Sequence, residues 1–219
     1  MAHTAAHALR RDAVRNRDEL LACAQREIAR DPRVSLATIA QAAGLTRRAL
    51  YGHFADRDAL VRAVIERGAD RFNAIANGVA EAEPLEELIE LTTRLWHEAS
   101  LVHASAAIAL EERYLALTAA SLAPLRARLA AIVEDGQRTE QIRRDISAAM
   151  LTRLIEETAR TLIVRWDQQD AEVTAQLAVR AVLSIAGLSW QDVEARLAST
   201  STSTSTSTST STKGASGAR

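Results

Sequence analysis

The stretch SLATIAQAAGLTRRALYGHF, residues 35–54, decides the fold of this 219-residue chain. Its apolar residues predict a short helix over 36–43, followed by Gly44, which suits the left-handed conformation at a helix end. Thr46 can then cap a second short helix over about 46–53. Two short helices joined by a tight glycine turn are typical of a helix-turn-helix, whose second helix fits the major groove of DNA.

The second helix carries the side chains that can meet DNA. Leu45 and Leu50 are expected to fill the joint between the helices. The residues left to face outward are Thr46, Arg47, Arg48, Tyr51 and His53. Arginine can form two parallel hydrogen bonds with guanine, whereas a threonine hydroxyl and the N-terminal amides of a helix suit phosphate. The alternatives are a packed ring for Tyr51 and a merely solvated pair for the two arginines.

The distribution of charge agrees with a nucleic-acid partner. Residues 1–68 carry 12 arginines and 8 acidic residues, a net charge of +4. Residues 69–198 carry 13 arginines and 20 acidic residues, a net charge of −7. A basic head on an acidic body favours contact between the head and a polyanion.

The rest of the chain also has helical periodicity, with no convincing strand pattern. Further helices are expected over 15–30, 57–77, 84–100, 104–118, 122–137, 146–167, 171–187 and 190–198. We therefore predict an all-α fold in four parts: a flexible N-terminal arm (1–14), a helix-turn-helix DNA-binding domain (15–56), a connector helix with a regulatory and dimerisation body (57–198), and a disordered Ser/Thr tail (199–219). The tail is assigned from its strict Ser-Thr alternation, which has almost nothing to bury.

The last two long helices predict a homodimer. Residues 146–167 and 171–187 are apolar over wide arcs, and such helices need partners on two sides. One side is their own domain, and the other is expected to be a second copy, in a four-helix interface about a two-fold axis. A two-fold dimer presents two recognition helices about one DNA turn apart or slightly more, and so implies a palindromic operator.

Several classes of protein are disfavoured by composition. The single cysteine, Cys23, excludes an internal disulfide framework and a cysteine-based zinc site. No apolar run reaches about 18 residues, and the N-terminal stretch lacks the apolar core of a secretory signal, so a cytoplasmic protein with no membrane partner is expected. We find no Gly-rich phosphate loop, nucleophile elbow or paired-carboxylate signature, and His97 and His103 do not have metalloprotease spacing. We therefore expect no enzyme activity, cofactor or metal.

Residues 18–68 resemble the DNA-binding domain of the TetR family of transcriptional regulators. The resemblance is carried by Ile39-Ala40-x-x-Ala43-Gly44-Leu45, by Leu50-Tyr51-x-His53-Phe54 and by Arg57-Asp58-Ala59-Leu60. Two positions depart from the family pattern. Asp31-Pro32 replaces the usual glycine after the first helix, and Arg57 stands where the family usually has lysine, which keeps the positive charge but changes its geometry.

The resemblance implies a role for each matching residue. Thr46, Arg47 and Arg48 would open the recognition helix and touch bases or phosphates. Tyr51 and His53 would contact the DNA backbone, and Arg57 would hold a phosphate. The family also dimerises through its last two long helices and binds its ligand in the body, beneath the connector helix. Candidate lining residues for that pocket are Phe72, Trp96, His97, His103, Leu110, Glu111, Tyr114 and Trp166, each of which could instead be ordinary core or surface.

The resulting hypothesis is a repressor that binds a palindromic operator as a homodimer and is released by a small-molecule effector in the body. Two alternatives stay open. The chain could be a helical small-molecule carrier or enzyme with a vestigial head, which a DNA mobility-shift assay would distinguish. It could also be a TetR-like regulator that senses a protein partner, which a closed body without a cavity would favour.

Overall fold

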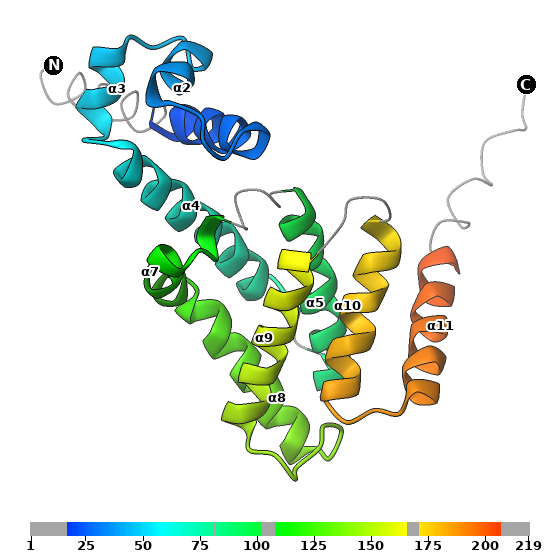
Figure 1. Ribbon diagram of the computed structural model, residues 1–219. Coiled ribbons are helices and arrows are strands. Elements are labelled where there is room, and N and C mark those ends of the chain that lie inside the picture. Colours follow the sequence, from blue (N-terminus) through cyan, green and yellow to red (C-terminus); the bar gives the residue numbers. More distant parts are fainter. Residues whose placement is uncertain (1–16, 81, 102–107, 166–170, 207–219) are drawn as a thin grey trace, which may run out of the picture.

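The computed structural model describes residues 17–80, 82–101, 108–165 and 171–206. Every regular element in these ranges is a helix, which confirms the predicted all-α fold. Figure 1 shows a small head and a larger helical body joined by one long diagonal helix.

The head consists of the helix 17–30, α2 (Leu36–Ala42) and α3 (Arg47–His53). Both short helices have the predicted caps. The Ser35 hydroxyl accepts a hydrogen bond from the Thr38 amide at 3.1 Å, and the Thr46 hydroxyl accepts one from the Ala49 amide at 3.2 Å. Between the helices, Gly44 has a φ of 67°, a left-handed conformation that favours glycine. The predicted helix-turn-helix is therefore confirmed.

The connector is α4 (Arg57–Asn77), which begins at the head and runs across the body (Figure 1). The Asp56 carboxylate caps it by accepting a hydrogen bond from the Ala59 amide at 2.7 Å. Its first turns bury Leu60 and Val64 in the head's hydrophobic cluster, whereas Ala76 belongs to the cluster of the body. One helix thus contributes to both cores.

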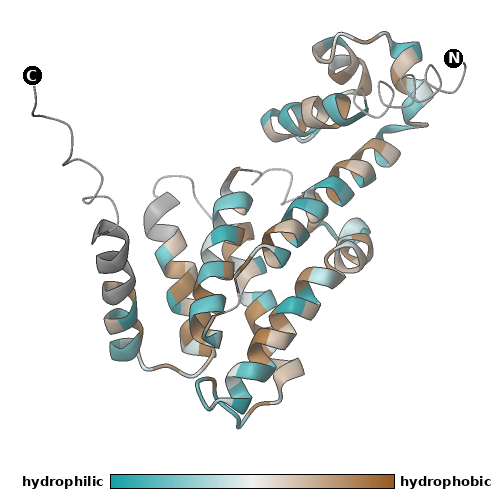
Figure 2. Ribbon diagram, turned by 180° about the vertical axis from the view of Figure 1, so that it is seen from behind, coloured by the Kyte–Doolittle hydropathy of each residue, from teal (hydrophilic) through white to brown (hydrophobic). Residues whose placement is uncertain are grey.

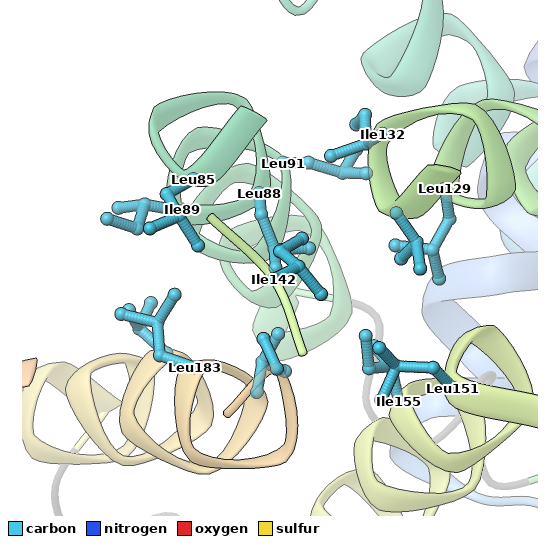
Figure 3. Packing of buried hydrophobic residues seen from close by; sticks show 14 of the residues in the cluster. Leu85, Leu88, Ile89, Leu91, Leu129, Ile132, Ile142, Leu151, Ile155 and Leu183 are labelled. Carbon is cyan, nitrogen blue, oxygen red and sulfur yellow. The ribbon is translucent and has the colours of Figure 1, made fainter. Parts of the chain in front are cut away.

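The body contains α5 (Pro84–Leu101), the short 3-10 helix η1 (Glu112–Tyr114), α7 (Leu115–Ser121), α8 (Ala123–Arg138), α9 (Ala148–Arg165), α10 (Ala171–Ile185) and α11 (Trp190–Thr206). Each long helix carries an apolar stripe and a polar face (Figure 2). The stripes meet in one core, where side chains from α5, α8, α9 and α10 point toward one another (Figure 3). Burial of these side chains, rather than helix propensity alone, stabilises the packing of the body helices.

The structure differs from the single helix expected over 104–118. Residues 102–107 lie outside the description, and Glu111 has an extended backbone, with φ −64° and ψ 144°, between residue 109 and η1. This break brings Tyr114 into the head, where it is fully buried. Apolar spacing alone predicted an unbroken helix because it does not reveal that neighbouring apolar residues belong to two different cores.

The last helix of the structure extends further than the sequence predicted. α11 continues to Thr206, so it includes residues 199–206 of the Ser-Thr alternation, where we expected disorder. Serine and threonine are modest helix formers, and a helix already nucleated can propagate through them.

No single helix in the described ranges is long and apolar enough to cross a membrane. The bent pair Glu112–Ser121 and Ala123–Arg138, at 64°, reaches that length and composition only when taken together.

Deleting residues 199–219 is expected to change the free energy of unfolding by less than about 0.5 kcal/mol, because the segment has almost no apolar side chain to bury. Thermal unfolding of the full and shortened chains measures this. A deletion of 190–219 is the control and should destabilise strongly, because it removes Val193, which is only 2% exposed in the body core. A large loss of stability in the shorter deletion would show that the tail is packed.

Candidate DNA-binding head and ligand cavity

Helix α3, the second helix of the helix-turn-helix, presents its polar side chains to solvent. Arg47 and Arg48 lie exposed in its first turn, and His53 lies exposed in its last. Tyr51 is 55% exposed, so it is not the packed ring that was the alternative at this position. Leu50 is the buried residue of α3 and anchors the helix to the head core. The two arginines are therefore held outward by a helix whose opposite side is fixed.

Arg57 is only half-buried, and two of its donors are already engaged. Its Nε donates to the Val34 carbonyl at 3.2 Å, and its Nη2 donates to the Pro32 carbonyl. These bonds tie the start of α4 to the turn at Asp31-Pro32, the place where the sequence departs from the family's usual glycine. Among the described residues no partner is seen for Nη1, which leaves one edge of the guanidinium for a phosphate.

A cavity of about 470 Å³ lies in the body beneath α4. Helices α4, α5, α7, α8, α9 and α10 all contribute to its wall. The lining residues are Phe72, Leu91, Thr92, Leu95, Trp96, Ala99, Leu110, Leu115, Thr118, Ala119, Leu122, Leu125, Arg126, Leu129, Ile155, Glu156, Glu157, Ala159, Arg160, Ile163 and Val182. Two of the labelled side chains in Figure 3, Leu129 and Ile155, approach each other from α8 and α9.

The structure places some expected lining residues in the cavity and others elsewhere. Phe72, Trp96 and Leu110 line it. His97 is exposed on α5, and Glu111 is exposed and forms an ion pair with Arg113 at 2.8 Å, so neither belongs to the lining. His103 and Trp166 lie outside the described residues. The described ranges contain no group of three or more His, Cys, Asp or Glu side chains placed to hold a metal ion.

Tyr114 also lies outside the cavity lining, because its ring is buried in the core of the head. Its hydroxyl donates to Oδ1 of Asp58 at 2.7 Å, and the Nε of Arg62 donates to Oδ2 of the same carboxylate at 2.6 Å. The guanidinium groups of Arg62 and Arg113 lie 5.7 and 4.7 Å from the ring centroid. Tyr114, which follows the body helix α5 in the chain, thus packs inside the head core, and its hydrogen bond to Asp58 in the first turn of α4 fixes its position.

The ionisation of this pair favours the hydrogen bond. The hydrogen bond from Arg62, followed by that from Tyr114, lowers the pKa of Asp58. Burial, followed by the hydrogen bond to Asp58, raises the pKa of Tyr114. At neutral pH the phenol therefore stays a donor and the carboxylate stays an acceptor.

The segment 108–122 contacts the head and the cavity at the same time. Ile108 and Tyr114 pack in the head core, whereas Leu115 and Thr118 line the cavity. A second link runs through Arg71 of α4, whose Nη2 donates to Gln25 of the first helix at 3.0 Å and whose Nη1 donates to Glu98 of α5 at 3.1 Å. A movement of the cavity wall can thus reach the head through contiguous contacts.

Sequence reasoning missed the wall supplied by α8 and α9. Its polar part consists of Arg126, Glu156, Glu157 and Arg160. Spacing offers a partial signal, because Glu156 and Arg160 are four residues apart and share one face of a helix. The pairing of Glu156 with Arg126 of the preceding helix, at 2.6 Å, has no signal in a single sequence.

Large apolar side chains remain exposed on the outer faces of α9 and α10. Met150 is 52% exposed, Leu154 is 40% exposed and Leu177 is 49% exposed. Ala181, half-buried, is one turn beyond Leu177 on the same side of α10. These are the two helices for which the sequence predicted a second partner surface.

Comparison with known proteins begins with the head. The family model for bacterial regulatory proteins of the tetR family matches residues 25–64, which include α2, α3 and the first part of α4. No curated protein is similar enough in sequence to be a relative.

Solved structures extend the similarity to the body, although all three described here are below 25% identity and therefore show the fold alone. The ketosteroid transcriptional regulator KstR2 of Mycobacterium tuberculosis is 21% identical, with a TM-score of 0.60 over 78% of this chain and 93% of its own. FadR from Bacillus subtilis in complex with stearoyl-CoA is 14% identical, with a TM-score of 0.67 over 77% of this chain and 97% of its own. GusR of Salmonella enterica is 22% identical, with a TM-score of 0.64 over 79% and 96%.

The family model on the head and the shared fold of the body agree with the capped helix-turn-helix and the long connector described above. Over residues 25–64 the chain is thus similar to the bacterial regulatory proteins of the tetR family, and over most of its length it shares the fold of the three solved structures.

Proposed function

We propose that this protein is a transcriptional repressor that binds a palindromic operator as a homodimer and is released by a small molecule in its body. The head, residues 15–56, would bind DNA, and residues 57–198 would hold the connector, the ligand and the dimer interface. The observation that carries the proposal is the pair of exposed arginines in the first turn of α3. This helix lies within residues 25–64, the part of the chain that matches the tetR family model.

In this proposal each head residue has a distinct partner on DNA. Arg47 and Arg48 enter the major groove, where arginine reads guanine with two hydrogen bonds. Thr46 and the free amides of the first turn of α3 face phosphate, and Tyr51 and His53 contact the backbone. Arg57 holds a phosphate with the edge of its guanidinium that the turn at Pro32 does not use.

The dimer sets the spacing of the two heads. The exposed apolar side chains of α9 and α10 would pack on the same faces of a second copy, in an interface with two-fold symmetry. Two recognition helices related by this axis match half-sites about one DNA turn apart or slightly more.

Release follows from the contacts between cavity and head. A ligand that fills the cavity presses on Leu115 and Thr118, and the same segment holds Tyr114 in the head. The bound state then favours another spacing of the heads, so affinity for the operator falls. Such a shift requires that the ligand binds the two states with different affinity.

A small-molecule effector is supported over the alternatives. A closed body would have favoured a protein partner, and this body has a cavity of about 470 Å³. FadR, which shares the fold, was crystallised with stearoyl-CoA. The exposed arginines of α3 speak against a carrier or enzyme with a vestigial head.

A mobility-shift assay with the DNA upstream of the chain's own gene tests the proposal. We expect a complex whose stoichiometry is two chains per site and whose footprint contains an inverted repeat. Scrambled DNA of the same length and composition is the control. Equal affinity for the two DNAs at several salt concentrations would contradict a sequence-specific regulator.

Replacing Tyr114 with phenylalanine is expected to loosen the head from the body. The variant keeps the packed ring but loses the hydrogen bond to Asp58, which is about half exposed, so the cost should be about 1 kcal/mol. Amide hydrogen exchange should then be about fivefold faster in the helix 17–30 and α2, and unchanged in α8 and α10.

The control is Tyr51→Phe, which removes the hydroxyl of the exposed tyrosine in the same head. Its exchange rates should match those of the unmodified protein. If Tyr114→Phe also leaves the head unchanged, the hydroxyl does not hold the head in place and another contact, such as that of Arg71, carries the coupling.

A further inference from the structure

The polar side chains that line the cavity already have partners within the protein. The Thr92 hydroxyl donates to the Leu88 carbonyl at 2.7 Å, and the Thr118 hydroxyl donates to the Ala109 carbonyl at 2.7 Å. Both hydroxyl donors are therefore engaged by backbone carbonyls. Apart from Trp96 the remaining deep wall is aliphatic or phenyl, so it offers a ligand apolar contact.

The charged residues gather at the solvent-exposed edge of the cavity and neutralise one another. Arg126 of α8 and Glu156 of α9 form an ion pair at 2.6 Å, with side chains 45% and 29% exposed. Arg160 and Glu157 form a second pair at 2.7 Å. Two positive and two negative charges thus sum to zero, and both arginines are engaged.

Neutrality of the edge has a consequence for the ligand's polar end. A carboxylate placed there would lose water and find no unpaired cation in the described lining, while Glu156 and Glu157 would repel it. An ammonium group would meet the same difficulty with Arg126 and Arg160. A hydroxyl or carbonyl can instead donate to a glutamate or accept from an arginine without separating either pair.

The size of the space limits the ligand. If each non-hydrogen atom takes roughly the 30 Å³ that a water molecule occupies in the liquid, about 470 Å³ holds about fifteen atoms. This is the size of a single medium-length hydrocarbon chain or a small ring system.

We propose that the cavity takes an uncharged, mainly apolar molecule of about fifteen non-hydrogen atoms, and that Glu156 makes the site selective against carboxylates by occupying Arg126. The inference rests on the proposed effector-binding role of the body and names the chemical class of that effector. It does not depend on the DNA contacts of the head.

Calorimetric titration of the full chain with three probes of equal chain length tests this: dodecan-1-ol, dodecanoate and dodecylammonium. Dodecan-1-ol should bind at least about tenfold more tightly than either ion, which is a difference of about 1.4 kcal/mol. Glu156→Gln should tighten dodecanoate by about tenfold, because it leaves Arg126 unpaired, and should leave dodecan-1-ol within about twofold.

Two matched controls keep the result specific to the site. Glu134→Gln removes the same charge from an exposed position of α8 outside the lining and should leave all three affinities unchanged. Ala159→Phe fills the cavity from α9 and should abolish binding of dodecan-1-ol, whereas Ala149→Phe, at an exposed position of the same helix outside the lining, should not.

The outcomes separate this inference from the proposed function. Equal or tighter binding of dodecanoate than of dodecan-1-ol to the unmodified protein would overturn the selectivity. Failure of all three probes to bind, or binding that Ala159→Phe leaves unchanged, would overturn the assignment of the cavity. Neither result affects operator binding, which the mobility shift measures without any probe.

Discussion

Replacing Arg47 or Arg48 with alanine is expected to weaken operator binding by about 1–3 kcal/mol for at least one of the two positions and to relax the preference at one base pair. Both side chains are exposed in the first turn of α3, the part of a recognition helix nearest the base edges. Binding isotherms on operator and scrambled DNA at several salt concentrations measure the effect.

Replacing Arg57 with alanine tests a contact to phosphate, in contrast to the base contacts expected of Arg47 and Arg48. A phosphate contact predicts weaker binding to operator and scrambled DNA alike, and a salt slope lower by roughly one unit per subunit. If the slope is unchanged, Arg57 only braces the turn at Pro32, where two of its donors are engaged. If both Arg47→Ala and Arg48→Ala keep operator affinity and base preference, α3 is not the recognition helix.

The head was predictable because its signals are local. Ser35, Gly44 and Thr46 are capping and turn residues whose effect reaches only three or four positions along the chain, and the structure has each of them in the expected role. The same holds for the start of α4, where Asp56 caps the helix.

The cavity and the segment 108–122, which contacts both the head and the cavity, were only partly predictable, because their contacts join residues far apart in sequence. Tyr114 was expected in the cavity as one of few aromatic residues of the body, but it reaches Asp58, 56 positions earlier. Likewise, Arg57 was expected to hold a phosphate, but its additional bonds to the carbonyls of Pro32 and Val34 depend on how the turn folds back. Residue type indicated that these side chains matter, but the partner depends on tertiary packing.

Replacing Ala181 with glutamate is expected to dissociate the homodimer and thereby remove most operator affinity. Ala181 is half-buried on the side of α10 that carries the exposed Leu177, and a dimer would enclose it. An unpaired carboxylate buried in each half of a symmetric interface costs several kcal/mol, about 3–5 by comparison with broken buried pairs. Analytical ultracentrifugation at micromolar concentration should show a dimer for the unmodified chain and a monomer for the variant.

The matched control is Ala195→Glu, the same change at an exposed position of α11, which should remain dimeric. Operator affinity should follow the oligomeric state, because a monomer engages one half-site and loses the gain from linking two binding events. A variant that is monomeric yet binds the operator as tightly as the unmodified chain would show that one head suffices. A monomeric unmodified chain would remove the basis for a palindromic operator and leave Met150, Leu154 and Leu177 to pack against something other than a second copy.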